Sequence, residues 1–216
     1  MLEQNKLYLH NCDNMEFMKT IPDKFFELAI CDPEYGLDIA NSNDTKGGNG
    51  KANKKKYTKK DWDKSTPKDQ YFSELFRISK NQIIWGANYF GLIGGYIFWD
   101  KEVTMPTFSA GELAYCSLIN KVDYVKIAWH GMIQHNMQNK EIRIHPTQKP
   151  IALYKWLLSK YAKQGDKIFD SHLGSMSSVI AAYEMGFEIH GCELDKEYFD
   201  AGVKRVTNVL RQLKLF

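Results

Sequence analysis

The sequence predicts an α/β fold in which helices cover both faces of a mostly parallel sheet. Three observations support this prediction. Short apolar segments alternate along the chain with longer segments of helical periodicity. One of them, residues 26–31, is apolar at nearly every position, which is typical of a strand buried on both faces of a parallel sheet. Polar residues follow several of these segments, and open α/β sheets bind ligands at the carboxyl ends of their strands.

The first two thirds of the chain contain most of the predicted strands. Helices are expected at residues 14–20 and 69–78, between strands that are mainly apolar. The last two strand candidates of this part are expected to pair as an antiparallel hairpin. The predicted strands are residues 6–11, 26–31, 82–86, 96–100, 112–118 and 124–129.

The last third alternates helix and strand. Pro150 introduces a helix over residues 151–163, because proline is favoured in the first turn of a helix. A second helix is expected at residues 177–185, and strands at residues 167–170 and 188–193. The final helix has an apolar face whose side chains are three or four positions apart, namely Phe199, Val203, Val206, Leu210 and Leu213.

Length and composition limit the class of protein. A chain of 216 residues suits a single domain, and we expect one over residues 1–216. No segment approaches the roughly 20 apolar residues of a membrane span, and the first ten residues lack a secretion signal. We therefore expect a cytoplasmic protein without membrane contact. The cysteines are widely separated and form no Cys-x-x-Cys pair, so neither zinc nor disulfides are expected: Cys12, Cys31, Cys116 and Cys192.

Three polar sites each lie at the carboxyl end of a predicted strand. The first is the tetrapeptide Asp-Pro-Glu-Tyr at residues 32–35, and the second is a turn of small residues at 169–175. The third is Glu193, which lies 19 residues after Gly174. An acidic residue about 20 positions after such a turn binds ribose hydroxyls in nucleotide-binding units. Because the turn has a single glycine, a cofactor without phosphates is favoured, and S-adenosylmethionine is the candidate.

Five motifs in this order carry a family resemblance. They are CDPEYG at 31–36, QIIWGANYF at 82–90, HPTQKP at 145–150, FDSHLGS at 169–175 and GCELDKEYF at 191–199. The chain resembles the amino-group DNA methyltransferases of the β arrangement, in particular small adenine-N6 enzymes of phages and prophages.

The resemblance implies a Rossmann-like S-adenosylmethionine-dependent methyltransferase fold. Its sheet would be mostly parallel and seven-stranded with an antiparallel hairpin, and its motif order circularly permuted. The implied reaction is transfer of a methyl group to the N6 amine of adenine in DNA. Such an enzyme works in a bacterial or phage-infected cell, in a restriction–modification pair or as an orphan phage methylase.

The chemistry of the amine explains the tetrapeptide. The lone pair of an adenine amine is delocalised into the ring, so acceptors must hold its hydrogens while the nitrogen attacks. Asp32 and the backbone carbonyl of Pro33 are expected to be these acceptors. Tyr35 would stack on a base flipped out of the duplex. The predicted catalytic residues are therefore Asp32, Pro33 and Tyr35.

The resemblance also implies a set of cofactor-binding residues. The turn would surround the methionine moiety, Glu193 would bind the ribose, and Asp13 would contact the adenine of the cofactor. HPTQKP would form the wall beside the amino-acid end. The complete predicted set is Asp13, Asp32, His145, Thr147, Lys149, Asp170, Ser171, His172, Leu173, Gly174 and Glu193.

Two residues depart from the family pattern. Glu34 replaces a second proline, and either adds a charge near Asp32 or points to solvent. Met176 replaces a second glycine, and either crowds the cofactor or caps its pocket. These departures keep open a catalytically silent DNA-binding protein. Cytosine-N4 transfer poses the same chemical problem, but those enzymes more often have serine at the position of Asp32.

DNA contacts are expected from a basic insert. The net charge of +3 divides into +6 in residues 41–68 and −3 elsewhere. This mobile insert starts five residues after Gly36, next to the active site, and lysines bind phosphates without reading sequence. Residues 101–144 are the space left for a small target-recognition region, and a homodimer would enlarge the DNA contact. The predicted DNA-binding residues are Lys54, Lys55, Lys56, Lys59 and Lys60.

Overall fold

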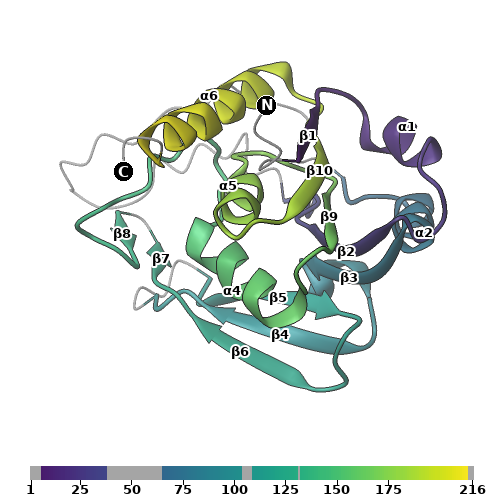
Figure 1. Ribbon diagram of the computed structural model, residues 1–216. Coiled ribbons are helices and arrows are strands. Elements are labelled where there is room, and N and C mark those ends of the chain that lie inside the picture. The colour runs from purple at the N-terminus through teal and green to yellow at the C-terminus, as the bar shows by residue number, and fades with distance from the viewer. Residues whose placement is uncertain (1–5, 38–64, 104–108, 131, 214–216) are drawn as a thin grey trace.

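A sheet of eight strands forms the centre of the molecule (Figure 1). The computed structural model describes residues 6–37, 65–103, 109–130 and 132–213. The strands lie in the order β1-β10-β9-β2-β3-β5-β4-β6. Their bounds in that order are Leu7–His10, Glu188–Cys192, Lys167–Asp170, Phe26–Cys31, Ser79–Trp85, Gly111–Cys116, Gly95–Asp100 and Val122–Lys126.

The predicted α/β architecture is confirmed. All neighbouring strands pair in parallel except at β5, which runs antiparallel to both β3 and β4. The main sheet has eight strands in the described residues, one more than the predicted seven. A separate two-stranded sheet joins β7 (Trp129–His130) and β8 (Ile133–Gln134).

The antiparallel hairpin consists of a different pair of strands from the predicted one. The segments expected to pair contain β5 and β6, but β4 lies between these two strands. The hairpin is β4–β5, with Gly95 opposite Cys116 and Asp100 opposite Gly111. β6 takes the edge of the sheet, and its alternation of exposed and buried residues suits that position.

Helices cover both faces of the sheet (Figure 1). On one face α1 and α2 pack with Ala29 and Cys31 of β2, and on the other α4, α5 and α6 pack with Leu28 and Ile30. This alternation explains why β2 is apolar at nearly every position. The helices are α1 (Asn14–Lys19), α2 (Asp69–Ile78), the short α3 (Ala87–Phe90), α4 (Ile151–Tyr161), α5 (Ser177–Glu184) and α6 (Lys196–Leu213).

The apolar face of α6 packs as predicted. Val206 is buried, and Phe199, Val203 and Leu210 pack against the same core. The side chain of Leu213 lies outside the described part. Among the described residues, no helix has the length and apolar character that a membrane span requires.

The polar residues predicted to form the site gather at the edge of the sheet where the parallel strands end. β1, β10, β9 and β2 are parallel neighbours, so the residues that follow them lie side by side. Glu112 reaches the same edge by another route. It stands at the start of β5, and β5 runs in the opposite direction, with Ala114 opposite Trp85 near the end of β3.

Candidate active site

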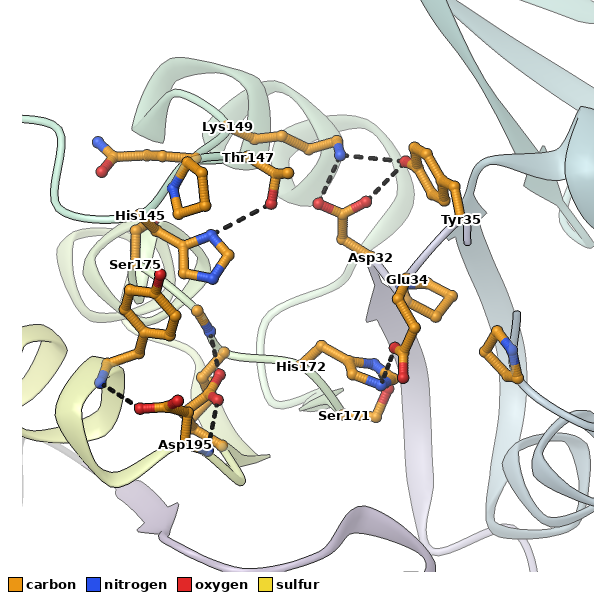
Figure 2. A pocket seen from close by; sticks show the side chains of 18 of the residues that line it. Asp32, Glu34, Tyr35, His145, Thr147, Lys149, Ser171, His172, Ser175 and Asp195 are labelled. Atoms are coloured by element: carbon orange, nitrogen blue, oxygen red, sulfur yellow. Dashed lines mark hydrogen bonds and ion pairs between the residues drawn. The ribbon is translucent and has the colours of Figure 1, made fainter. Parts of the chain in front are cut away.

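A cavity of about 940 Å³ opens at this edge. Its volume lies near the upper end of the roughly 300–1,000 Å³ that ligand pockets occupy, which leaves room for a cofactor and a base. Nearly all of the predicted catalytic and cofactor-binding residues line it, several of which Figure 2 shows. They are Asp13, Asp32, Pro33, Tyr35, His145, Thr147, Lys149, Ser171, His172, Leu173, Gly174 and Glu193.

Asp32 is held from two sides. The hydroxyl of Tyr35 donates to its Oδ1 at 2.7 Å, and the Nζ of Lys149 lies 2.5 Å from its Oδ2 (Figure 2). The Lys149 side chain is only 3% exposed. Its ammonium group therefore points at the catalytic tetrapeptide, although HPTQKP was expected to face the cofactor.

The QIIWGANYF motif makes room for Tyr35. A Cβ on Gly86 would lie 2.3 Å from Cε1 of the Tyr35 ring, and Gly86 has a φ of +81°, a conformation that favours glycine. Tyr89 stacks on the ring with centroids 4.9 Å apart. Tyr89 thus supports one face of Tyr35, and the motif serves to position the tetrapeptide.

Glu112 is a member of the site that no motif predicted. Its Oε2 lies 2.9 Å from Nζ of Lys149 and 3.3 Å from the Tyr35 hydroxyl oxygen, while Lys101 pairs with its Oε1. Burial acts to raise the pKa of Glu112, but Lys149 and Lys101 outweigh it and lower the pKa to about 2. Two ammonium groups and two carboxylates, the second being Asp32, thus meet in one place.

Asp170 supports the cofactor turn from behind and is not part of the cavity wall. It is 1% exposed, accepts from the backbone N–H of His172 at 3.0 Å and from the Ser178 hydroxyl at 2.5 Å. Burial raises its pKa to about 7, against the effect of these hydrogen bonds. The structure thus gives it contacts that shape the turn.

His172 and Glu34 form a pair in the cavity wall. His172 Nε2 lies 3.1 Å from Glu34 Oε2, and the Ser171 hydroxyl is 2.8 Å from the other ring nitrogen (Figure 2). Burial alone would raise the pKa of Glu34, but His172 outweighs it and lowers that pKa. The unusual glutamate is therefore engaged with the cofactor turn rather than pointing to solvent.

Glu193 lies beside the turn at the end of β10. One carboxylate oxygen accepts from Gly174 N at 2.8 Å and the other from Asp195 N at 2.9 Å. Each oxygen keeps a second lone pair, so the carboxylate can still accept hydroxyl hydrogens. Asp13 has a different structural role, because its Oδ1 caps α1 by accepting from Met15 N and Glu16 N.

The HPTQKP loop closes the site on the side of α6. The His145 ring packs edge-on against Tyr198, with centroids 4.3 Å apart, and its Nδ1 is 3.1 Å from the Thr147 hydroxyl. Burial lowers the pKa of His145 to about 4. Trp129 anchors the loop by donating from Nε1 to the carbonyl of Gln148 at 2.6 Å.

Met176 does not touch the cavity. It caps α5 with a φ of +59°, in the left-handed region where relatives with glycine would be unstrained. Its side chain is completely buried and lies against α6, where a Cβ on Gly202 would be 2.7 Å from Met176 Cγ. Both expectations for Met176, crowding the cofactor and capping its pocket, are therefore wrong, because the side chain turns toward the core.

Some predicted features are not covered by the described residues. Lys54, Lys55, Lys56, Lys59 and Lys60 lie outside them, so their contact with DNA stays a prediction. Of residues 101–144, β5 and β6 belong to the main sheet, which leaves mainly the segment around β7 and β8 for target recognition. In the described ranges, no group of three or more His, Cys, Asp or Glu side chains could hold a metal.

Comparison with known protein families identifies the chain. The model of the N6/N4 methyltransferase family, described as DNA methylases, matches residues 32–204. The chain belongs to this family. Membership confirms the prediction of a DNA methyltransferase that uses S-adenosylmethionine and acts on DNA. It does not distinguish adenine N6 from cytosine N4, and it does not assign the β arrangement.

Full-length relatives are distant in sequence. Type II methyltransferase M2.DpnII of Streptococcus pneumoniae is 23% identical over 251 residues, which cover 94% of this chain and 90% of that protein. M1.MboII of Moraxella bovis is 24% identical over the full length of both chains. DNA adenine methyltransferase YhdJ of Escherichia coli K12 is 35% identical over 66 residues, 31% of this chain and 22% of that protein.

Solved structures support the fold. The M1.HpyAVI–SAM complex superposes with a TM-score of 0.59 at 16% identity and covers 92% of this chain and 99% of that chain. PvuII DNA methyltransferase, described as cytosine-N4-specific, gives 0.64 at 12% identity and covers 97% of this chain and 93% of the other. At this low sequence identity, both similarities show that the chain has the same fold as these proteins.

The residues present fit S-adenosylmethionine. The turn at Gly174 has a φ of +47° at that glycine and offers no run of glycines to cradle a pyrophosphate. The acidic residues Asp13, Glu193 and Asp195 all line the cavity. Acceptors of this kind suit ribose hydroxyls and a ligand that carries positive charge.

Proposed function

We propose that the chain transfers a methyl group from S-adenosylmethionine to the N6 amine of adenine in DNA. The observation that carries this proposal is the position of Asp32. It is the first residue after β2, in a cavity that it shares with the cofactor turn, and its two oxygens are fixed by Tyr35 and Lys149. A fixed carboxylate is the acceptor that a weakly nucleophilic amine needs.

Two residues of the tetrapeptide act directly on the amine in the proposed reaction. Asp32 and the carbonyl of Pro33 accept the two hydrogens of the amine, so that the nitrogen lone pair leaves conjugation with the ring. Bound S-adenosylmethionine supplies an electrophilic methyl group. The amine loses one proton as it gains the methyl group, and Asp32 Oδ is the acceptor for that proton.

The target base must leave the duplex to reach Asp32. The cavity wall offers an aromatic surface for it, because the partly exposed ring of Tyr35 lines the wall. Tyr35 is braced by Tyr89, which suits a ring that supports a flipped base. Base stacking would thus hold the ring while Asp32 holds the amine.

Adenine is favoured over cytosine by the identity of residue 32. Cytosine-N4 enzymes of the family more often carry serine there, and YhdJ, a relative with adenine in its name, is 35% identical over the matched segment. The silent alternative loses its main support, because Met176 lies outside the cavity wall and Glu34 is paired with His172. The chain keeps every group that the proposed chemistry needs.

The decisive experiment identifies the methylated base. Purified protein is incubated with S-adenosylmethionine and unmethylated DNA, and the DNA is digested to nucleosides for mass spectrometry. N6-methyl-2′-deoxyadenosine is expected. N4-methylcytosine would replace the adenine assignment, and absence of transfer despite measurable cofactor binding would favour the silent DNA-binding protein. Contact of the lysines with DNA and a homodimer remain further proposals.

A further inference from the structure

Glu112 closes a ring of contacts around the catalytic aspartate. Tyr35 and Lys149 each contact one oxygen of Asp32, at 2.7 Å and 2.5 Å. The same two groups both contact Oε2 of Glu112, at 3.3 Å and 2.9 Å. Glu112 therefore binds both partners of Asp32 without being one itself, and its other oxygen is tied to Lys101.

The ring is buried and balanced in charge. The side chains of Asp32, Lys149 and Glu112 are 15%, 3% and 21% exposed. The two carboxylates offset the ammonium groups of Lys149 and Lys101. A buried ion-pair cluster of this kind is poor support for stability, because apolar side chains of similar volume often stabilise a core equally well or better. Its location beside the reaction site points to a different purpose.

We propose that Glu112 is a positioning residue for methyl transfer. It fixes Lys149 and Tyr35, and through them it aims the Asp32 carboxylate at the amine of the target base. It also cancels a positive charge in a cavity that binds a cationic methyl donor. This inference rests on the proposed function, but it holds for adenine and cytosine amines alike because both need the same acceptor.

The charged surroundings of Lys149 give the proposal a pH signature. Asp32 and Tyr35 face Lys149 from the loop after β2, and Glu112 faces it from β5. His145 belongs to the same loop as Lys149 and interacts with it electrostatically. Burial lowers the pKa of Lys149, but Asp32 and Glu112 outweigh burial and raise it. Loss of Glu112 removes one of the two carboxylates that keep Lys149 protonated, so activity should decline at a lower pH.

The test compares Glu112→Gln with Glu112→Asp and with a surface control. Glu102→Gln is the control, because Glu102 is exposed and pairs with the exposed Lys126. Each variant is checked for folding by thermal unfolding. Its kcat is measured from about pH 6 to 11, and its Kd for S-adenosylmethionine and for S-adenosylhomocysteine is measured by calorimetry.

Glu112→Gln should lower kcat by about 10- to 100-fold, the scale on which misplaced catalytic groups act. The alkaline limb of its pH profile should move to lower pH, because one of the two carboxylates that raise the pKa of Lys149 is gone. Its affinity for the cationic methyl donor should fall more than its affinity for the uncharged thioether product. Glu112→Asp keeps the charge, so it should retain the wild-type ratio of the two affinities, with a partial loss of kcat.

A folded Glu112→Gln protein with wild-type kcat and an unmoved pH profile would overturn the proposal. If Glu112→Gln does not fold, Glu112→Asp decides, since an unchanged kcat in that variant contradicts positioning. If the wild-type protein transfers no methyl group to any DNA, the proposed function has failed. The calorimetric measurements can still be made in that case. Equal losses of affinity for S-adenosylmethionine and S-adenosylhomocysteine in Glu112→Gln would then refute the charge-balancing role.

Discussion

The two halves of the cavity are assembled in different ways. The cofactor half comes from the ends of parallel neighbours, β9 and β10, and its contacts are mainly carboxylates that receive backbone N–H groups. The catalytic half brings together Asp32, Lys101, Glu112 and Lys149, four residues from separate segments that touch through charged side chains. The first half is organised by its own backbone, whereas the second depends on long-range packing.

This difference predicts how substitutions in each half should affect the rate of transfer and the affinity for the cofactor. A carboxylate that orders a turn shares its task with the surrounding backbone hydrogen bonds, so its loss should be felt mainly in binding. A charge in the buried ring has no substitute, since removing one member leaves the others unbalanced. Substitutions in the catalytic half should therefore affect the rate, and those in the cofactor half should affect affinity or stability.

The largest effect is expected for Asp32→Ala. The variant loses the acceptor for the amine, so kcat should fall by about 100- to 1,000-fold, as when a preorganised charge-stabilising group is removed. Radiolabelled methyl transfer to DNA measures it, with Asp23→Ala as a control at an exposed site that pairs with Arg77. Transfer at the wild-type rate would show that Asp32 is not the acceptor.

A stability effect is expected at His145 on the cofactor side. Burial keeps this ring neutral, with a pKa of about 4 against an ordinary 6.5, so protonation favours the unfolded chain. The stabilising effect of the neutral ring is complete above about pH 6.5, the pKa in the unfolded chain, and is lost as the pH falls toward 4, the pKa in the fold. As the pH falls from 7 to 5, the free energy of unfolding of the wild-type protein should decrease by about 2 kcal/mol more than that of His145→Gln.

Urea unfolding of both proteins at pH 5 and 7 measures this difference. His135→Gln serves as the control, because His135 is exposed. Equal losses of stability in the wild type and His145→Gln would mean that His145 is not held neutral by the fold. The comparison between variants removes the effect of all other titrating groups.

A smaller effect is expected for Glu193→Gln. The amide keeps one acceptor oxygen but loses the charge and one acceptor, so the Kd for S-adenosylmethionine should rise about tenfold, the equivalent of one charged hydrogen bond. The kcat at saturating cofactor should stay within twofold of the wild type. Calorimetry is the measurement, with the exposed Glu197→Gln as control. A large fall in kcat with unchanged affinity would place Glu193 in the catalytic half instead.

The smallest effect is expected for Met176→Gly. Glycine relieves about 1–2 kcal/mol of left-handed strain, but the loss of a buried methionine side chain costs about 2–5 kcal/mol. A net destabilisation of about 1 kcal/mol is expected, with unchanged cofactor affinity, because the side chain faces Gly202 and not the cavity. A changed Kd would show that Met176 acts on the cofactor after all.

Much of the cofactor half could be predicted from the sequence. An apolar strand, a small-residue turn and an acidic residue at a set spacing are local patterns, and the turn and Glu193 lie together as the spacing predicts. Asp170 differs from the prediction, because it supports the turn from behind. Local periodicity also predicted the faces of β2 and α6. These features follow from side-chain spacing along a helix or strand, which neighbouring residues determine by themselves.

The catalytic half was decided by the tertiary structure. Asp32 and Lys149 were each predicted within a motif, but their contact and the role of Glu112 in it were not. Glu112 reaches the site because β5 runs antiparallel, which brings the start of a strand to the edge where the other strands end. Strand order and direction depend on packing between segments that are distant in the sequence, and no local pattern of residues records that choice.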